Sequence, residues 1–319
     1  MNARLIFKVL ALATGVAMSV AAAPAMAGAV LTSGNGNVTL GVKNNGALGF
    51  GGVGIFKASL GDGITPGCLC EGWGVAANGV AGWSANAAGE WNISSGAGTG
   101  MIGSTFVSNT FLTSLSGLTI SQAYGQSASG ALLKNHVTIM NTTGAAMTDL
   151  RYSRAMDWDI PPTPFSELIT IGGVGASALL FSNDNGFAKP NPLVNPSALT
   201  AGTTNVNFVD SGPGDHGGFF TFGFGKLAAG ASKEFDIFYG ATDSETAAFA
   251  ALTSVGAEVY SFGQSRGNGS TGMPGTFLLG FSGVGGTPVG DVPEPASLAL
   301  FGVGLAGIAA LRRRRKAAE

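Results

Sequence analysis

The chain has 319 residues, with 53 glycines, 20 phenylalanines and only 11% charged residues. Glycine is well above the usual ~7% without a collagen period, and the 45% share of hydrophobic residues excludes a disordered chain. Residues 28–292 hold 9 basic and 16 acidic side chains, a net charge of about −7, which excludes nucleic acid and anionic membrane surfaces as natural partners.

The first 27 residues have the three parts of a secretory signal peptide. Two basic residues precede an apolar run over residues 9–23, and the small residues Ala25 and Ala27 end the segment. This order predicts export through the Sec translocon and cleavage by signal peptidase before Gly28. A buried N-terminal helix is the alternative, and the order of basic, apolar and small residues argues against it.

Short β-branched or aromatic runs between glycine and asparagine turns predict a mainly β, antiparallel body over residues 28–291. The predicted strands include residues 38–42, 101–107, 118–120, 137–140, 151–160, 206–209, 219–224 and 235–239. A chain of this length can form one large β-sandwich, or two sandwiches with a boundary near residues 161–200, where prolines gather.

One short helix is predicted after residue 242. Thr242 and Glu245 have the spacing of a capping box, and Phe249, Leu252 and Val255 then recur at helical intervals.

The clearest strand is the segment RYSRAMDWDI. Its alternation directs Tyr152, Arg154 and Trp158 toward the core. Asp157 and Asp159 lie on the opposite face, which we predict to be solvated.

Paired carboxylates are what a glycoside hydrolase needs, and Asp157, Asp159 and the nearby Glu167 are the candidates in this chain. Strand alternation already explains the two aspartates as a solvent-facing pair, so we predict no catalytic residue. The four tryptophans, which could stack on sugars, are Trp73, Trp83, Trp91 and Trp158. Trp158 is expected in the core.

Two oxygen-rich turns are the candidate cation sites. Asn183, Asp184 and Asn185 form one turn, and Asp210 and Asp215 flank the other. Calcium prefers such oxygen ligands, but neither turn has the spacing of an EF-hand loop, and turn formation alone explains the asparagines. Two histidines are too few for a histidine-rich zinc site. We therefore predict no metal and no cofactor.

Cys68 and Cys70 are the only cysteines. Two thiolates are too few for zinc, which takes about four ligands. Export through an oxidising compartment favours a disulfide between them, whereas the single intervening residue makes a tight ring that opposes it. Both states stay open at this point.

The chain ends in VPEPASLALFGVGLAGIAALRRRRKAAE. Residues 296–311 form an apolar run of 16 residues, which as a helix would span ~24 Å of a hydrocarbon core of ~30 Å. The run therefore predicts a single transmembrane helix. The cations that follow it, which keep this end in the cytoplasm by the positive-inside rule, are Arg312, Arg313, Arg314, Arg315 and Lys316.

Pro293, Glu294 and Pro295 ahead of the apolar run, with the basic tail behind it, closely resemble the PEP-CTERM sorting signal of Gram-negative bacteria. The resemblance covers residues 292–319 and implies a transient anchor in the inner membrane. It also implies that an exosortase, a membrane cysteine transpeptidase, recognises the triplet. The protein would then be sorted to the outer surface or the extracellular matrix of an organism that makes exopolysaccharide.

These inferences predict a non-enzymatic structural or adhesive surface protein that is associated with exopolysaccharide or biofilm. Its expected partners are the Sec translocon, signal peptidase, an exosortase, and extracellular polysaccharide or other surface components. The alternative is a carbohydrate-binding protein or a glycoside hydrolase that acts on extracellular polysaccharide through Asp157, Asp159 and exposed tryptophans.

Overall fold

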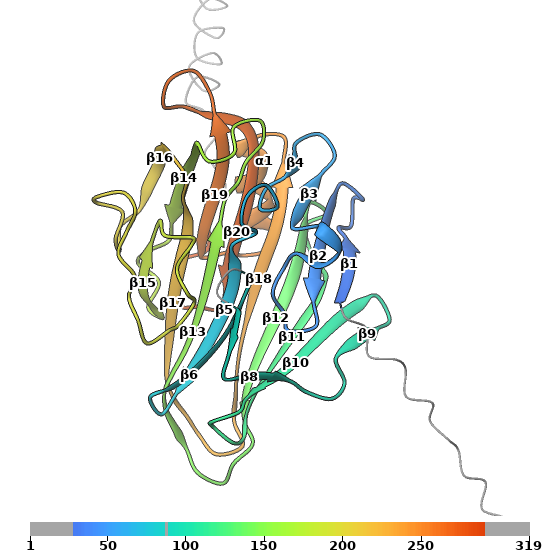
Figure 1. Ribbon diagram of the computed structural model, residues 1–319, viewed down its shortest axis with the longest axis vertical. Coiled ribbons are helices and arrows are strands. Elements are labelled where there is room, and N and C mark those ends of the chain that lie inside the picture. Colours follow the sequence, from blue (N-terminus) through green and yellow to red (C-terminus); the bar gives the residue numbers. More distant parts are fainter. Residues whose placement is uncertain (1–27, 87–88, 291–319) are drawn as a thin grey trace, which may run out of the picture.

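The computed structural model describes residues 28–86 and 89–290, which form three antiparallel sheets (Figure 1). The largest sheet contains β8 (Ile93–Ser95), β9 (Gly100–Ile102), β10 (Thr105–Leu112), β11 (Leu118–Gln126), β12 (Leu132–Asn141), β14 (Glu167–Gly172), β16 (Phe208–Gly214), β18 (Ser232–Thr242), β19 (Val259–Arg266) and β20 (Gly272–Ser282). Its strand order is β16-β14-β19-β20-β18-β12-β11-β10-β8, and β9 pairs with β10.

Two smaller sheets complete the described part of the chain. The six-stranded sheet, in the order β15-β17-β13-β5-β6-β7, contains β5 (Glu71–Ala77), β6 (Val80–Ala85), β7 (Gly89–Trp91), β13 (Met147–Asp157), β15 (Leu179–Asn183) and β17 (Gly217–Leu227). The four-stranded sheet contains β1 (Gly28–Thr32), β2 (Val38–Lys43), β3 (Ile55–Lys57) and β4 (Gly61–Asp62). The helical segments are η1 (Phe50–Gly52) and α1 (Glu245–Ser254).

The two large sheets pack face to face as a β-sandwich. Phe220 and Phe222 of β17 lie on one face of their strand and contact Phe281 of β20, with ring centroids 5.2 and 4.9 Å apart. Tyr152 of β13 meets Phe235 of β18 edge-on at 5.0 Å. These aromatic contacts join the six-stranded and ten-stranded sheets, so the prediction of a mainly β, antiparallel sandwich is confirmed.

The four-stranded sheet closes one side of this sandwich. Strand β3 lies against β18, and Figure 1 shows β1, β2 and β3 beside it. The turn after β2 enters the interior, where the carbonyl of Asn45 accepts a hydrogen bond from the Trp73 indole (2.8 Å). The carbonyl of Gly46 accepts one from the Tyr124 hydroxyl (2.6 Å). All three sheets therefore share one hydrophobic core.

Strand pairing shows that the alternative of two sandwiches divided near residues 161–200 is wrong. Strand β13 precedes this range and β17 follows it, yet the two pair residue by residue over most of their length. Strands β12 and β18 also pair across the range. A boundary there would cut both large sheets.

The proline-rich segment within this range covers the outer face of the six-stranded sheet. The Ser153 hydroxyl of β13 donates a hydrogen bond to the carbonyl of Pro190. A Cβ atom on Gly186 would lie 2.6 Å from the Cα of Asp157, so this loop runs directly against the strand. The predicted solvated face of β13 is therefore wrong: Asp157 is 1% exposed and Asp159 is 0% exposed.

Helix α1 lies where it was predicted, but a different residue caps it. The side chain of Ser244 accepts a hydrogen bond from the Ala247 amide (3.2 Å), which satisfies a free N–H of the first turn. Thr242 still ends β18, and its hydroxyl donates to the Ser244 carbonyl (2.8 Å). Another correction concerns residues 101–107, which form the hairpin of β9 and β10 rather than one strand.

Among the described residues, no helix has the length and apolar character needed to cross a bilayer. The predicted signal peptide (1–27), transmembrane segment (296–311) and basic tail (312–316) lie outside the described residues.

Candidate metal centre

Strand register brings three aspartates together at one end of the six-stranded sheet. Strands β13 and β17 are antiparallel, with Asp157 opposite Gly217. Continuing this ladder by two residues places Asp159 opposite Asp215, on the turn that enters β17. One carboxylate oxygen from each of Asp157, Asp159 and Asp215 lies within 4.8 Å of the others. We call these three residues the carboxylate cluster.

Glu167 adds a fourth acidic group beside the carboxylate cluster. It begins β14, which pairs with β16, the strand that leads to Asp215. The side chain of Glu167 is fully buried, and its backbone carbonyl faces Nε2 of His216 at 3.3 Å.

The buried carboxylates lack the hydrogen bonds that such groups normally make. Both side-chain oxygens of Asp159, both of Glu167 and Oδ1 of Asp157 are buried and have no hydrogen-bond partner among the described residues. Asp62 shows the usual arrangement, because its carboxylate accepts hydrogen bonds from three backbone amides at 2.8–3.0 Å. A buried polar group without a hydrogen-bond partner costs free energy, so these carboxylates destabilise the folded protein unless a proton or a ligand satisfies them.

The environment of the carboxylate cluster disfavours ionised carboxylates. Burial, with a further contribution from neighbouring carboxylates, raises the pKa of Asp157 to about 9 and that of Asp159 to about 7. Burial likewise raises the pKa of Glu167 to about 8. Near neutral pH these side chains therefore take up protons unless another positive charge is present.

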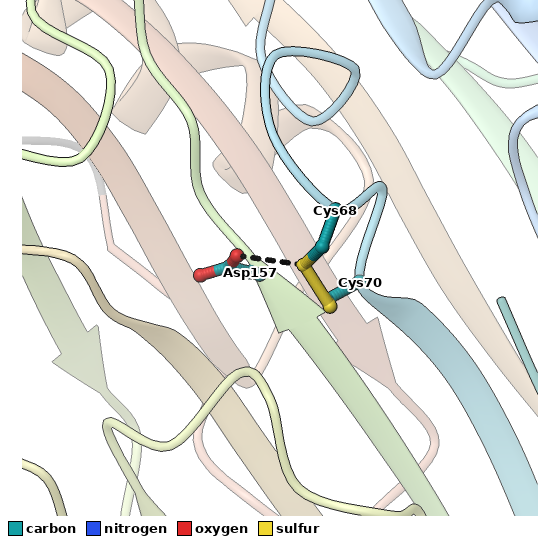
Figure 2. A group of neighbouring side chains, drawn as sticks. All are labelled: Cys68, Cys70 and Asp157. Carbon is teal, nitrogen blue, oxygen red and sulfur yellow. Dashed lines mark hydrogen bonds between the residues drawn. A yellow bond between two sulfur atoms is a disulfide. The ribbon is translucent and has the colours of Figure 1, made fainter. Parts of the chain in front are cut away.

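A disulfide between Cys68 and Cys70 borders the cluster (Figure 2). The Sγ atom of Cys68 lies 3.6 Å from Oδ2 of Asp157. Since both sulfur atoms are bonded to each other, neither is a thiolate that could bind a metal. The donors at this site are oxygens only.

In the turn that was considered for calcium, both carboxylate oxygens of Asp184 already have partners within the protein. Oδ1 of Asp184 accepts hydrogen bonds from the Leu199 amide and the Thr203 hydroxyl, both at 2.9 Å. Oδ2 accepts one from the Thr200 amide at 2.9 Å and faces Nδ1 of His216 at 3.2 Å. Burial would raise the pKa of Asp184, but these hydrogen bonds outweigh it and hold the pKa well below its usual range.

The flanking asparagines also have structural partners. The amide groups of Asn183 and Asn185 donate to the carbonyls of Pro196 and Ser197, both at 2.8 Å. The Asn185 backbone amide donates to Oδ1 of Asn183. This turn anchors the loop that covers the sheet, in agreement with the turn interpretation.

We expect Asp184→Ala to lower the free energy of unfolding by about 3 kcal/mol or more, because it leaves several buried donors without an acceptor. The folded-state pKa is depressed, so this contribution is present above the unfolded pKa of about 3.9 and is lost as pH falls through the folded-state value. Urea denaturation at pH 7 measures the effect. The exposed Glu234, which lies 3.8 Å from His136, is the control; equal losses from Asp184→Ala and Glu234→Ala would contradict the assignment.

The tryptophans divide into buried and exposed groups. Trp73 and Trp158 are fully buried, as was expected for Trp158. Trp83 of β6 stacks on Trp91 of β7, with centroids 5.9 Å apart, and Trp91 is 62% exposed. Only the second pair offers an aromatic surface to a ligand.

A buried ion pair inside the sandwich was not predicted. Arg154 of β13 and Glu71 of β5 form a salt bridge in which both side chains are fully buried. Oε2 of Glu71 accepts a hydrogen bond from the Leu48 amide (2.7 Å), and the Arg154 guanidinium lies 5.3 Å from the centre of the Tyr239 ring. Burial would lower the pKa of Arg154, but Glu71 outweighs this and raises it. Alternation placed Arg154 on the core face, but nothing in the sequence identified its partner.

Several predicted site residues cannot be placed in this geometry. Ala25, Ala27, the Pro293, Glu294 and Pro295 triplet and the basic tail at 312–316 lie outside the described residues. Gly28 is described and begins β1. Asp210 is not a member of the carboxylate cluster, although Asp215 is.

The described residues define a mainly β, antiparallel sandwich, a class of fold that hosts many functions. A model of the PEP-CTERM protein-sorting motif matches residues 291–315. The predicted resemblance of this segment to a PEP-CTERM sorting signal is thereby confirmed, and the motif implies export, processing by an exosortase and transient membrane anchoring before surface display. No curated protein matches this chain.

Proposed function

We propose that this protein is a non-enzymatic structural or adhesive component of the bacterial surface or extracellular matrix, associated with exopolysaccharide. The observation that carries the proposal is the sorting motif at residues 291–315, which follows a closed sandwich. An exported domain with one continuous core and few charges is suited to a durable surface layer.

The burial of the carboxylates argues against a glycoside hydrolase. Asp157 and Asp159 are 1% and 0% exposed, so a sugar cannot reach them in this conformation.

A carbohydrate-binding role is the second candidate, and the Trp83–Trp91 stack favours it. Trp91 presents a large, rigid aromatic surface on the edge strand β7, and Trp83 supports it from beneath. Such side chains supply apolar contact area together with a polar N–H group. Binding of polysaccharide by Trp83 and Trp91 would give the proposed adhesive protein its contact with the matrix.

We expect Trp91→Ala to reduce retention of the full chain on exopolysaccharide from the native host by about tenfold, the effect of losing ~1.4 kcal/mol. Co-sedimentation with the polysaccharide measures retention. The control is Phe56→Ala, which removes an exposed aromatic side chain from β3 in the four-stranded sheet. Equal retention of both variants would reject the tryptophan surface. Release of reducing sugars that Asp157→Asn abolishes would show a hydrolase and overturn the non-enzymatic proposal.

A further inference from the structure

The carboxylate cluster has the dimensions of a cation site. Oxygen ligands lie 2.3–2.6 Å from calcium, so two ligands of one ion are at most ~5 Å apart. The oxygens of Asp157, Asp159 and Asp215 meet this limit, since they lie within 4.8 Å of one another. The three residues come from the end of β13 and the turn before β17, and strand pairing holds both segments in place.

The unpartnered carboxylate of Asp159 is a second, independent observation that points to a ligand. Its side chain is fully buried, and neither oxygen has a partner among the described residues. A Cβ atom on Gly67 would lie 3.2 Å from both oxygens, so the backbone of this loop closes over the carboxylate without a side chain. Elsewhere the same protein gives its aspartates several donors, as at Asp62 and Asp184. The donors are absent where three carboxylates converge.

Within residues 28–86 and 89–290, no basic side chain forms an ion pair with the carboxylate cluster or with Glu167. The nearby His216 has one ring nitrogen facing Asp184 and the other facing the Glu167 carbonyl. Burial, with a further contribution from the neighbouring carboxylates, raises the pKa of Asp157 and Asp159.

We propose that Asp157, Asp159 and Asp215 bind one Ca²⁺ ion, with Glu167 as a further acidic group at the same site. Hard oxygen donors select calcium over zinc, and the disulfide removes the neighbouring sulfurs from competition. Asp215 is exposed and provides the route of entry. An exported protein meets calcium outside the cell, where modules with dissociation constants of about 0.1–1 mM are occupied.

The bound ion would link the two large sheets. Asp215 lies between β16 of the ten-stranded sheet and β17 of the six-stranded sheet, and Asp157 ends β13. Because a ligand that binds only the folded state stabilises it, calcium would hold this end of the sandwich together.

The test uses the full chain, purified in mild detergent and stripped with EDTA. Calorimetric titration with CaCl₂ should show one saturable site, and the melting temperature should rise by several degrees in millimolar calcium. Absence of binding would overturn the proposal. So would binding of Mg²⁺ or Zn²⁺ without binding of Ca²⁺.

Two variants distinguish the cluster from surface binding. Asp159→Asn should abolish the calcium response and melt in EDTA at or above the temperature of the unaltered protein, because it removes an unpartnered buried carboxylate. Asp215→Asn changes an exposed side chain and should also abolish the response, which keeps the test valid if the first variant fails to fold. The control Asp149→Asn lies at the other end of β13 and should respond fully. A calcium response that persists in Asp215→Asn would overturn the assignment.

Discussion

Glu71→Met is expected to lower the free energy of unfolding by about 3–5 kcal/mol, because it leaves the Arg154 guanidinium buried without its counter-charge. Glu71 and Arg154 are both fully inaccessible to solvent. Among the described residues, the other polar contacts of Arg154 are the Tyr239 ring at 5.3 Å, the Tyr152 hydroxyl at 3.4 Å and Oε1 of Gln122 at 3.5 Å. These neutral groups cannot replace a carboxylate. Chemical denaturation of the purified chain measures the loss.

The double variant Glu71→Met with Arg154→Met provides the control. Replacing a buried ion pair with apolar residues of similar size is often neutral or stabilising, so the double variant should recover most of the lost stability. A double-mutant cycle then gives the coupling between the two side chains. Single variants that lose less than about 1 kcal/mol would show that the interior tolerates an unpaired charge, contrary to the expectation from burial.

Replacing Pro293, Glu294 and Pro295 with alanine should abolish surface display in the native host. The motif match at residues 291–315 includes this triplet, which the exosortase is expected to recognise. The unaltered protein should begin at Gly28 and end at or near Pro295. The variant should keep its tail and fractionate with the inner membrane.

Intact-mass analysis of surface and membrane fractions measures this outcome. Glu319→Ala removes an acidic residue that lies beyond the matched motif, and this control should be processed normally. The basic tail should remain cytoplasmic, because moving five cations across the membrane is unfavourable. Surface-located protein that still carries residues 312–319 would show that the motif acts only as an anchor.

The spacing of apolar residues predicted several strands and the helix, because such spacing reflects which side chains share one face of an element. The spacing of Phe220 and Phe222 placed both rings on one face of β17, where they pack on Phe281. Helix α1 was predicted from its apolar spacing, although the cap is Ser244 rather than Thr242. Capping depends on which hydroxyl reaches a free N–H. Thr242 has the capping-box spacing to Glu245, whereas Ser244 has an alanine three residues later, so the sequence pattern selected the wrong hydroxyl.

The prediction of a solvated face on β13 was wrong. Alternation of apolar and polar residues shows which face of a strand packs on the core, but it does not show whether a distant loop covers the polar face. The outer face of this strand is buried by a loop near Pro190, more than thirty residues further along the chain. Prolines in that loop suggested a linker, since composition alone does not show what a loop packs against. The same loop runs against Asp157 at Gly186, and the loop at Gly67 lies against Asp159, so both predicted solvent-facing aspartates are buried.

Composition, alternation and the terminal segment determined by themselves a mainly β body and a PEP-CTERM sorting motif, which implies export, because each of these signals lies within a short stretch of chain. Only the tertiary structure decided which charged groups meet. Glu71 pairs with Arg154, and Asp215 joins Asp157 and Asp159, through strand register between segments that are about 60–80 residues apart. Register is set by the packing of whole sheets, so a single sequence does not display these contacts.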